Sequence, residues 1–241
     1  MFFSILETNA QQSIFIIRYP WLNKHIIKEN KVSSVTVKTY ADDTTDLIQI
    51  FSLKFDRKGR VIQEQVEAEE DLVRRIQYDN DGRITSSAIF RESTMISKDS
   101  INFNPANKSF VIYSFYQTWK REEFKHDSLG RILGFTVYSS NEANPVADFS
   151  KVKWVKGNTR FVKNNKEGNP EEISDNDYTA RYTYDSRGRL SWKEIEIYSL
   201  GTKETESFLY RLDGLPERSA STDQSFNVLK TYTYEFYKNE K

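Results

Sequence analysis

The stretch RYTYDSRGRL, residues 181–190, is the most informative part of this chain about its fold. Its first half places Tyr182 and Tyr184 on one face of an extended segment, the period of a β-strand. Asp185 follows, and an aspartate carboxylate accepts a hydrogen bond from the backbone two residues further on, which starts a turn. Gly188 supplies the positive φ that a bulged hairpin loop needs after a type I turn. The stretch therefore predicts a strand, a tight turn and a returning strand.

Near copies of this stretch recur along the chain at intervals of 20–38 residues. The clearer copies begin at Phe55, Tyr78 and His126, a weaker copy begins at Tyr210, and two degenerate copies begin at Phe103 and Asn164. A period near two dozen residues indicates a supersecondary repeat with room for two strands and two turns. The residues that we assign to turn structure are Asp56, Gly59, Asp79, Gly82, Asp127, Gly130, Asp185, Gly188 and Gly214.

The segments between the turns alternate apolar and polar residues, so we predict an all-β fold built as a long antiparallel meander of about fifteen strands. Side by side, such strands would span about 70 Å. Open sheets of that width curl or close, and we expect a strongly curved or closed sheet. The predicted organisation is an N-terminal segment, residues 1–30, and a repeat domain, residues 31–241. The first segment combines a candidate signal-peptide remnant at residues 1–12 with one short helix within residues 20–30.

The amino-acid composition argues against several classes of function. Lys plus Arg and Asp plus Glu both number 35, so no basic field indicates binding to nucleic acid. No apolar run reaches the ~18 residues of a membrane helix, and we expect no membrane span. The chain has no Cys, which excludes disulfides and thiolate chemistry but does not distinguish an exported protein from a cytoplasmic one.

No catalytic residue, metal site or cofactor is predicted. The sequence DNDG at residues 79–82 resembles the start of a calcium loop, but Ala88 and Ile89 stand where a ligand is needed. His126 replaces the tyrosine of a turn motif and is expected at a strand end. His25 is expected to pack or to face solvent, and no local signature supports a hydrolase triad.

Two groups of side chains are candidates for binding. The turn arginines, Arg60, Arg83, Arg131 and Arg189, form a row if the turns lie along one edge of the sheet. Pairing with aspartates of neighbouring turns is the simpler interpretation, and an anion-binding or partner-binding edge is the alternative. The aromatic candidates are Tyr116, Trp119, Trp154 and Trp192. They are expected either in the core or on a platform for a sugar, an apolar ligand or a peptide.

The stretches YTYDSRGRL, residues 182–190, and IQYDNDGRI, residues 76–84, resemble the tyrosine-aspartate repeats of the Rhs and teneurin families. The chain is also similar to short stand-alone, often secreted proteins of Bacteroidetes-type bacteria with a few degenerate copies. The resemblance implies a β-sheet that spirals into a shell around cargo. This chain has too few copies for a shell and no recognisable toxin or self-cleavage module.

Three functions remain open. The preferred hypothesis is a non-enzymatic binding or scaffold protein of the cell envelope or exterior, in the periplasm or outside the cell, that binds a protein or glycan through its curved sheet. The second is a polysaccharide- or peptide-acting hydrolase with acids on the concave face. The third is an immunity or chaperone partner of a larger repeat toxin.

Overall fold

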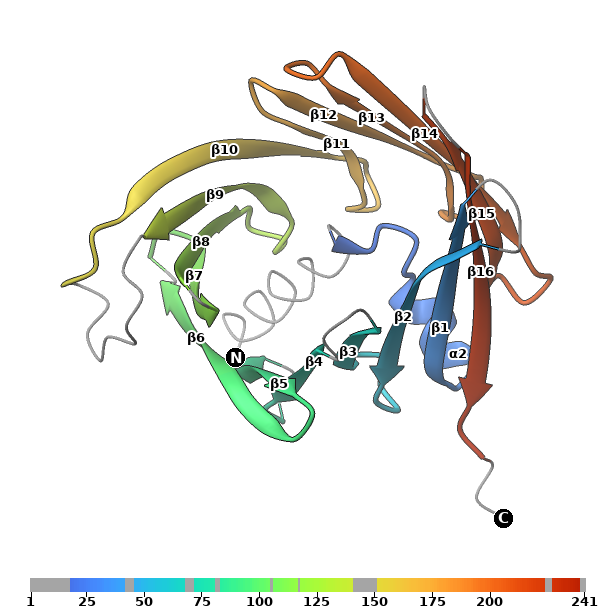
Figure 1. The fold of residues 1–241 in the computed structure, drawn as a ribbon, viewed down its shortest axis with the longest axis horizontal. Coiled ribbons are helices and arrows are strands. Elements are labelled where there is room, and N and C mark those ends of the chain that lie inside the picture. Colours follow the sequence, from blue (N-terminus) through green and yellow to red (C-terminus); the bar gives the residue numbers. More distant parts are fainter. Residues whose placement is uncertain are drawn as a thin grey trace.

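The computed structural model describes residues 18–41, 46–67, 72–80, 83–104, 106–116, 118–140, 151–223 and 227–238. In this part of the chain, one short helix, α2 (Lys24–Glu29), precedes sixteen strands that form a single ring (Figure 1). The strands are β1 (Val32–Ala41), β2 (Asp46–Phe55), β3 (Val61–Glu67), β4 (Leu72–Tyr78), β5 (Ile84–Arg91), β6 (Thr94–Asn104), β7 (Ser109–Tyr116), β8 (Thr118–His126), β9 (Ile132–Ser140), β10 (Val155–Asn164), β11 (Pro170–Ser174), β12 (Tyr178–Tyr184), β13 (Leu190–Ile197), β14 (Thr202–Tyr210), β15 (Pro216–Thr222) and β16 (Asn227–Phe236).

The ring is a closed antiparallel barrel in which each strand pairs with its sequence neighbours. β1 pairs with β2 on one side and with β16 on the other, from Val32 opposite Phe236 to Ala41 opposite Val228. Closure removes the two sheet edges that would otherwise offer unpaired backbone groups to another chain. The predicted all-β meander with one N-terminal helix is confirmed, in its closed form. The candidate signal remnant, residues 1–12, lies outside the described residues.

The repeated turns lie at one end of the barrel, called the turn end below, and the turn at residues 185–189 shows how they are built. The Oδ1 of Asp185 accepts hydrogen bonds from the backbone N–H groups of Arg187 and Arg189, both at 2.9 Å. Its Oδ2 accepts one from the Arg189 Nε at 2.7 Å. Gly188 has a φ of 72°, and the register shifts between Thr183 and Tyr184, which marks the bulge. Asp79 and Arg83 form the same side-chain contact, whereas Gly82 lies outside the described residues.

At several places a tyrosine near a strand end connects its strand to the previous repeat. The Tyr210 hydroxyl donates to the Leu190 carbonyl at 2.7 Å, and the Arg189 guanidinium lies 4.6 Å from the centre of the same ring. The same two contacts join Tyr78 to Val61 and Arg60, and Tyr234 to Pro216 and Arg211. The motif therefore recurs where a hairpin needs an aspartate cap and a glycine at positive φ, and at some of the turns a tyrosine adds a link to the preceding repeat.

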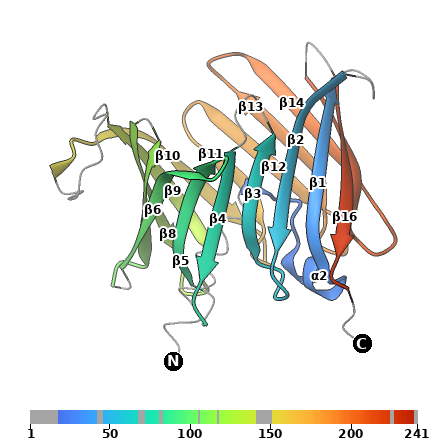
Figure 2. The ribbon, with the colours of Figure 1, turned by 60° about the horizontal axis from the view of Figure 1, so that its bottom comes forward.

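Helix α2 lies at the turn end of the barrel, beside β1 and against the turns at Gly59 and Gly214 (Figure 2). Its N-cap is Asn23, whose Oδ1 accepts from the N–H groups of His25 and Ile26. Ile27 is buried in the core, and the Asn30 side chain donates to the Asp213 carbonyl at the β14–β15 turn. The helix is shorter than the segment expected from the sequence, because residues 20–23 form a non-helical lead-in that ends at the cap.

The inward side chains near the turn end form two apolar clusters. One gathers around Val35, Leu53 and Leu215, and the other around Phe110 and Phe124, whose rings stack 4.8 Å apart. Trp21 and Ile101 touch both clusters. The turn end is therefore largely a packed core, with a cavity of about 180 Å³ between α2 and the turns at Gly188 and Gly214.

Candidate functional site

Away from the turn end, the inward positions change from apolar to charged. On β16, the inward series runs from Tyr234 through Tyr232 to Lys230, because side chains alternate along a strand. The other strands add charges at a similar distance from the turns. These residues are called the polar belt below and are Glu64, Arg74, Asp99, Glu122, Lys193, Glu206 and Lys230. The belt separates the apolar core from the remainder of the interior.

The best-connected part of the belt is centred on Glu206. Its Oε1 lies 2.8 Å from the Lys230 Nζ, and its Oε2 lies 3.3 Å from the Lys193 Nζ. The Ser219 hydroxyl donates to Oε1 at 2.7 Å and lies 3.2 Å from the Tyr232 hydroxyl. The Glu206 side chain is only 4% exposed. Burial alone would raise its pKa, but the two ammonium groups and the hydrogen bonds from Lys230 and Ser219 hold the pKa below its usual value.

A cavity of about 210 Å³ lies against these groups. One wall is the segment before α2, residues 18–23, called the strap below, which lies inside the ring of strands (Figure 1). The strap is held by ring contacts: Trp21 lies 5.2 Å from Tyr232 edge-on, and Tyr19 lies 5.2 Å from Phe51. The cavity thus combines aromatic walls with a small set of charged groups, the usual composition of a small-molecule site.

The strap also contacts the polar belt on the other side of the barrel. Arg18 lies 3.6 Å from the Glu122 carboxylate. Burial raises the pKa of Tyr19, and the neighbouring Glu64 carboxylate raises it further. The strap is therefore tied to the belt at both of these residues, and it links the cavity to the second charged group of the belt.

That second group is centred on Arg74. Its Nη1 lies 2.6 Å from the Asp99 Oδ2, and its Nε lies 3.4 Å from the Glu64 Oε2. Asp99 is 1% exposed at its side chain, and one oxygen of each carboxylate has no hydrogen-bond partner among the described residues. Two buried acids thus share one guanidinium. Within the described residues, no cluster of His, Asp and Glu side chains is arranged to hold a metal ion.

The turn arginines are engaged in structural contacts. Arg60, Arg131 and Arg189 each form an ion pair of 2.6 Å with the aspartate four residues earlier. We expected pairing between neighbouring turns, and this was wrong: the carboxylate is already positioned by its own turn, so the arginine after the glycine reaches it first. The link between turns is instead a tyrosine ring that lies against the arginine of the preceding repeat. Tyr78 contacts Arg60 in this way, and Tyr210 contacts Arg189.

The aromatic candidates are spread over several parts of the barrel wall. Trp119 of β8 is buried, whereas Trp192 of β13 is 41% exposed on the outer face. Trp154 lies 5.9 Å from Tyr113 of β7. The side chain of Tyr116 lies outside the described part of the chain. A single aromatic platform is therefore not formed by the three tryptophans.

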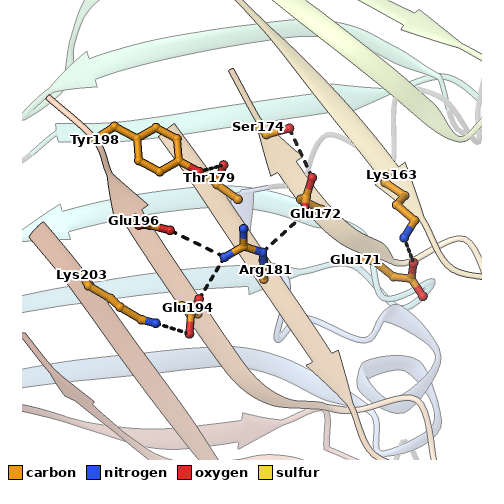
Figure 3. A network of polar contacts seen from close by, with 10 residues as sticks. All are labelled: Lys163, Glu171, Glu172, Ser174, Thr179, Arg181, Glu194, Glu196, Tyr198 and Lys203. Carbon is orange, nitrogen blue, oxygen red and sulfur yellow. Dashed lines mark hydrogen bonds and ion pairs between the residues drawn. The ribbon is translucent and has the colours of Figure 1, made fainter. Parts of the chain in front are cut away.

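The outer face of β11–β14 carries a network of opposite charges (Figure 3). Arg181 contacts Glu194 at 3.0 Å, Glu172 at 3.5 Å and Glu196 at 3.7 Å, and Lys203 contacts Glu194 at 2.9 Å. An outward Arg or Lys side chain at the middle of a bilayer costs about 2–4 kcal/mol. This part of the outer face is therefore better suited to water than to lipid. Across the described residues, the structure contains no helix with the length and apolar character of a membrane span.

A wider hollow of about 630 Å³ lies on β8–β10, where the β9–β10 register shifts between Lys156 and Thr159. Phe161 and Leu133 are exposed along it. Its charged residues, Glu123, Lys125 and Lys156, are not buried. Of these two, the smaller interior cavity is the better candidate, because buried, mutually held charges meet apolar walls there.

No protein-family model matches the chain, and no curated protein matches it. Among solved structures, it is similar to a porin-like protein from Bacteroides uniformis, with 8% identity, coverage of 86% of this chain and 97% of that chain, and a TM-score of 0.35. It is also similar to a β-barrel-like protein of a domain of unknown function from Brucella abortus, with 9% identity, coverage of 86% and 98%, and a TM-score of 0.30. Neither similarity is strong enough to support a statement on function.

These findings correct the resemblance to the tyrosine-aspartate repeat families. No model of such a family matches the chain. The sheet also closes with β1 against β16 instead of continuing as a spiral. The physical reason is that an aspartate cap, a glycine with positive φ and a paired arginine suit any hairpin turn of this geometry. The motif therefore indicates a type of hairpin turn, and it does not identify a protein family.

The sequence reasoning missed the residues of the cavity. A signal was present: Lys193 shares its alternation with Ile195 and Ile197, and Glu206 shares its own with Phe208 and Tyr210. A charged residue in the apolar register of an amphipathic strand is costly to bury without a partner. Such positions are candidates for a site, and here the barrel brings Lys193 and Glu206 together.

Proposed function

We propose that this protein is a non-enzymatic binding protein that holds a small amphipathic ligand inside its barrel. The observation that carries the proposal is the cavity between the strap and β13–β16, where Trp21 and Tyr232 form apolar walls beside Lys193, Glu206 and Lys230. Barrels commonly bind ligands in their interior, and apolar pockets with a few convergent polar groups are typical of such sites.

The composition of the cavity wall favours binding over glycoside hydrolysis. Hydrolysis of that kind uses two carboxylates on either side of the substrate. Among the described residues that line the cavity, Glu206 is the single acid, and its pKa is held low by two lysines. A carboxylate with a lowered pKa does not retain the proton that a general acid must donate.

The test is a matched pair of blocking variants. Thr39 of β1 lines the cavity, whereas Thr36 points to the outer face of the same strand. We expect Thr39→Trp to fill the cavity and to abolish binding, while Thr36→Trp leaves it intact. Binding is measured by calorimetry with octanoate, octan-1-ol and octylammonium, after circular dichroism shows that both variants are folded. The proposal is wrong if none of the three compounds binds the wild type, or if both variants bind alike.

Location at the cell envelope or exterior remains a part of this proposal that fractionation of the native host tests. Recovery of the protein in the periplasmic or extracellular fraction supports it, and recovery with the cytoplasmic fraction contradicts it. A protein or glycan partner bound through the curved sheet remains a prediction from the sequence.

A further inference from the structure

The walls of the interior cavity carry an excess of positive charge. Three basic residues, Arg18, Lys193 and Lys230, line the cavity, and Glu206 is the acidic residue among the described lining residues. Glu122 offsets Arg18 from outside the cavity, at 3.6 Å. The two lysines therefore share one carboxylate, and the group of three keeps one positive charge. An excess charge inside a protein is unfavourable unless a counter-charge joins it.

The lysines also have hydrogen-bonding capacity directed at the cavity. An ammonium group has three donors and no acceptor. Lys193 and Lys230 each donate one hydrogen bond to Glu206 within the described residues, and both line the cavity. Their side chains are 20% and 27% exposed, although the carboxylate between them is 4% exposed. The ammonium groups are thus more open to a ligand than the acid between them.

Apolar surface continues from this charged point along the strap. Trp21, Phe208 and Tyr232 line the same cavity, as do Tyr19 and Phe51. A volume of about 210 Å³ equals that of roughly seven water molecules, so the space suits a short chain or a small ring. We propose that the cavity selects an anionic amphiphile, with a carboxylate or phosphate on Lys193 and Lys230 and an apolar part against the aromatic side chains. This inference rests on the proposed function and names the chemistry of its ligand.

The first experiment compares probes that differ only in charge. Octanoate, octyl phosphate, octan-1-ol and octylammonium are titrated into the full chain by calorimetry. We expect an anionic probe to bind at least about tenfold more tightly than octan-1-ol, as a hydrogen bond to a charged group allows. Comparison of octanoate with octyl phosphate distinguishes the two headgroups. Equal binding of neutral and anionic probes, or preference for octylammonium, overturns the inference while leaving the proposed function intact.

The second experiment uses two variants with opposite expected signs. Lys230→Gln removes one positive charge and should abolish most of the preference for the anion. Glu206→Gln removes the competing carboxylate, so the anion should bind roughly tenfold more tightly, because both lysines then lack their counter-charge. A purely structural role for the three residues predicts weaker binding in both variants. That outcome, with both proteins folded, overturns the inference.

Lys203→Gln is the matched control. It removes the same charge from the outer face of β14, where Lys203 pairs with Glu194. Its affinity for octanoate should equal that of the wild type. A loss as large as that of Lys230→Gln would show that the preference comes from net charge and not from the cavity, which also overturns the inference.

Discussion

At the turn end of the barrel, the inward side chains are apolar and α2 lies at the rim, whereas further along the same strands the inward positions carry the polar belt. The turn end is built from a repeated motif, and several tyrosines there make the same contact with the preceding repeat. The belt residues follow no repeat. The difference indicates that the repeats build the barrel. Residues outside the repeated pattern supply the charged groups of its interior.

The strongest perturbation disrupts the belt itself. Arg74→Met leaves Asp99 and Glu64 buried with no counter-charge, which should lower the free energy of unfolding by about 3–5 kcal/mol. Urea unfolding measures the change. The control is Arg75→Met on the same strand, whose guanidinium lies outward over the Phe90 ring at 4.5 Å and should cost about 0.5–1 kcal/mol. Equal losses in the two variants would show that the inward acids do not depend on Arg74.

The next effect separates backbone strain from the packing of α2 at the turn end. Gly188 and Gly59 have φ values of 72° and 73°, so alanine meets the same strain at both, about 1–2 kcal/mol. An added Cβ at Gly188 meets no atom within 4 Å, but at Gly59 it would lie 2.8 Å from the Lys24 carbonyl oxygen. Gly59→Ala should therefore cost about 1–3 kcal/mol more. Thermal unfolding of both variants gives the difference, and equal costs would contradict the close contact with α2.

A smaller effect tests the link between repeats. Tyr210→Phe removes the hydroxyl that donates to the Leu190 carbonyl and keeps the ring against Arg189. The expected loss is about 0.5–1.5 kcal/mol in urea unfolding. Tyr40→Phe in β1 is the control, since its hydroxyl makes no such contact in the described structure, and it should change stability little. If Tyr210→Phe is neutral, the tyrosines of the motif serve only through their rings.

Much of the turn end could be predicted from the sequence, because its determinants are local. Asp185 and Gly188 form their turn within a few residues, and strand alternation places Tyr182 and Tyr184 inward without knowledge of distant parts. Closure of the barrel could be predicted only as one of two outcomes. It depends on β1 meeting β16, a pairing of segments about 200 residues apart that no local pattern specifies.

The site could not be predicted because its partners come from different strands. Glu206 reaches Lys193 on β13, Ser219 on β15 and Lys230 on β16, and these contacts depend on the register of three strand pairs. The sequence marks Lys193 and Glu206 only as charges in an apolar register. The turn arginines recur, and for that reason they were candidates for binding. They recur because each one pairs with the aspartate of its own turn.

The smallest effect compares acid sensitivity in the two regions. The pKa of Glu206 is held below its usual 4.5, and that of Asp185 is held below its usual 3.8, by hydrogen bonds from Arg189 and from the turn backbone. A lowered folded-state pKa stabilises the protein above the unfolded-state pKa, and this contribution is lost as the pH falls through the folded-state value. Glu206→Gln should therefore be less stable than the wild type at neutral pH, and its stability should fall less steeply below about pH 4.5. Asp185→Asn should flatten the curve only below about pH 3.8. Urea midpoints measured from pH 7 to pH 3 test this order, and a Glu206→Gln curve parallel to that of the wild type would show that the belt does not hold Glu206 ionised.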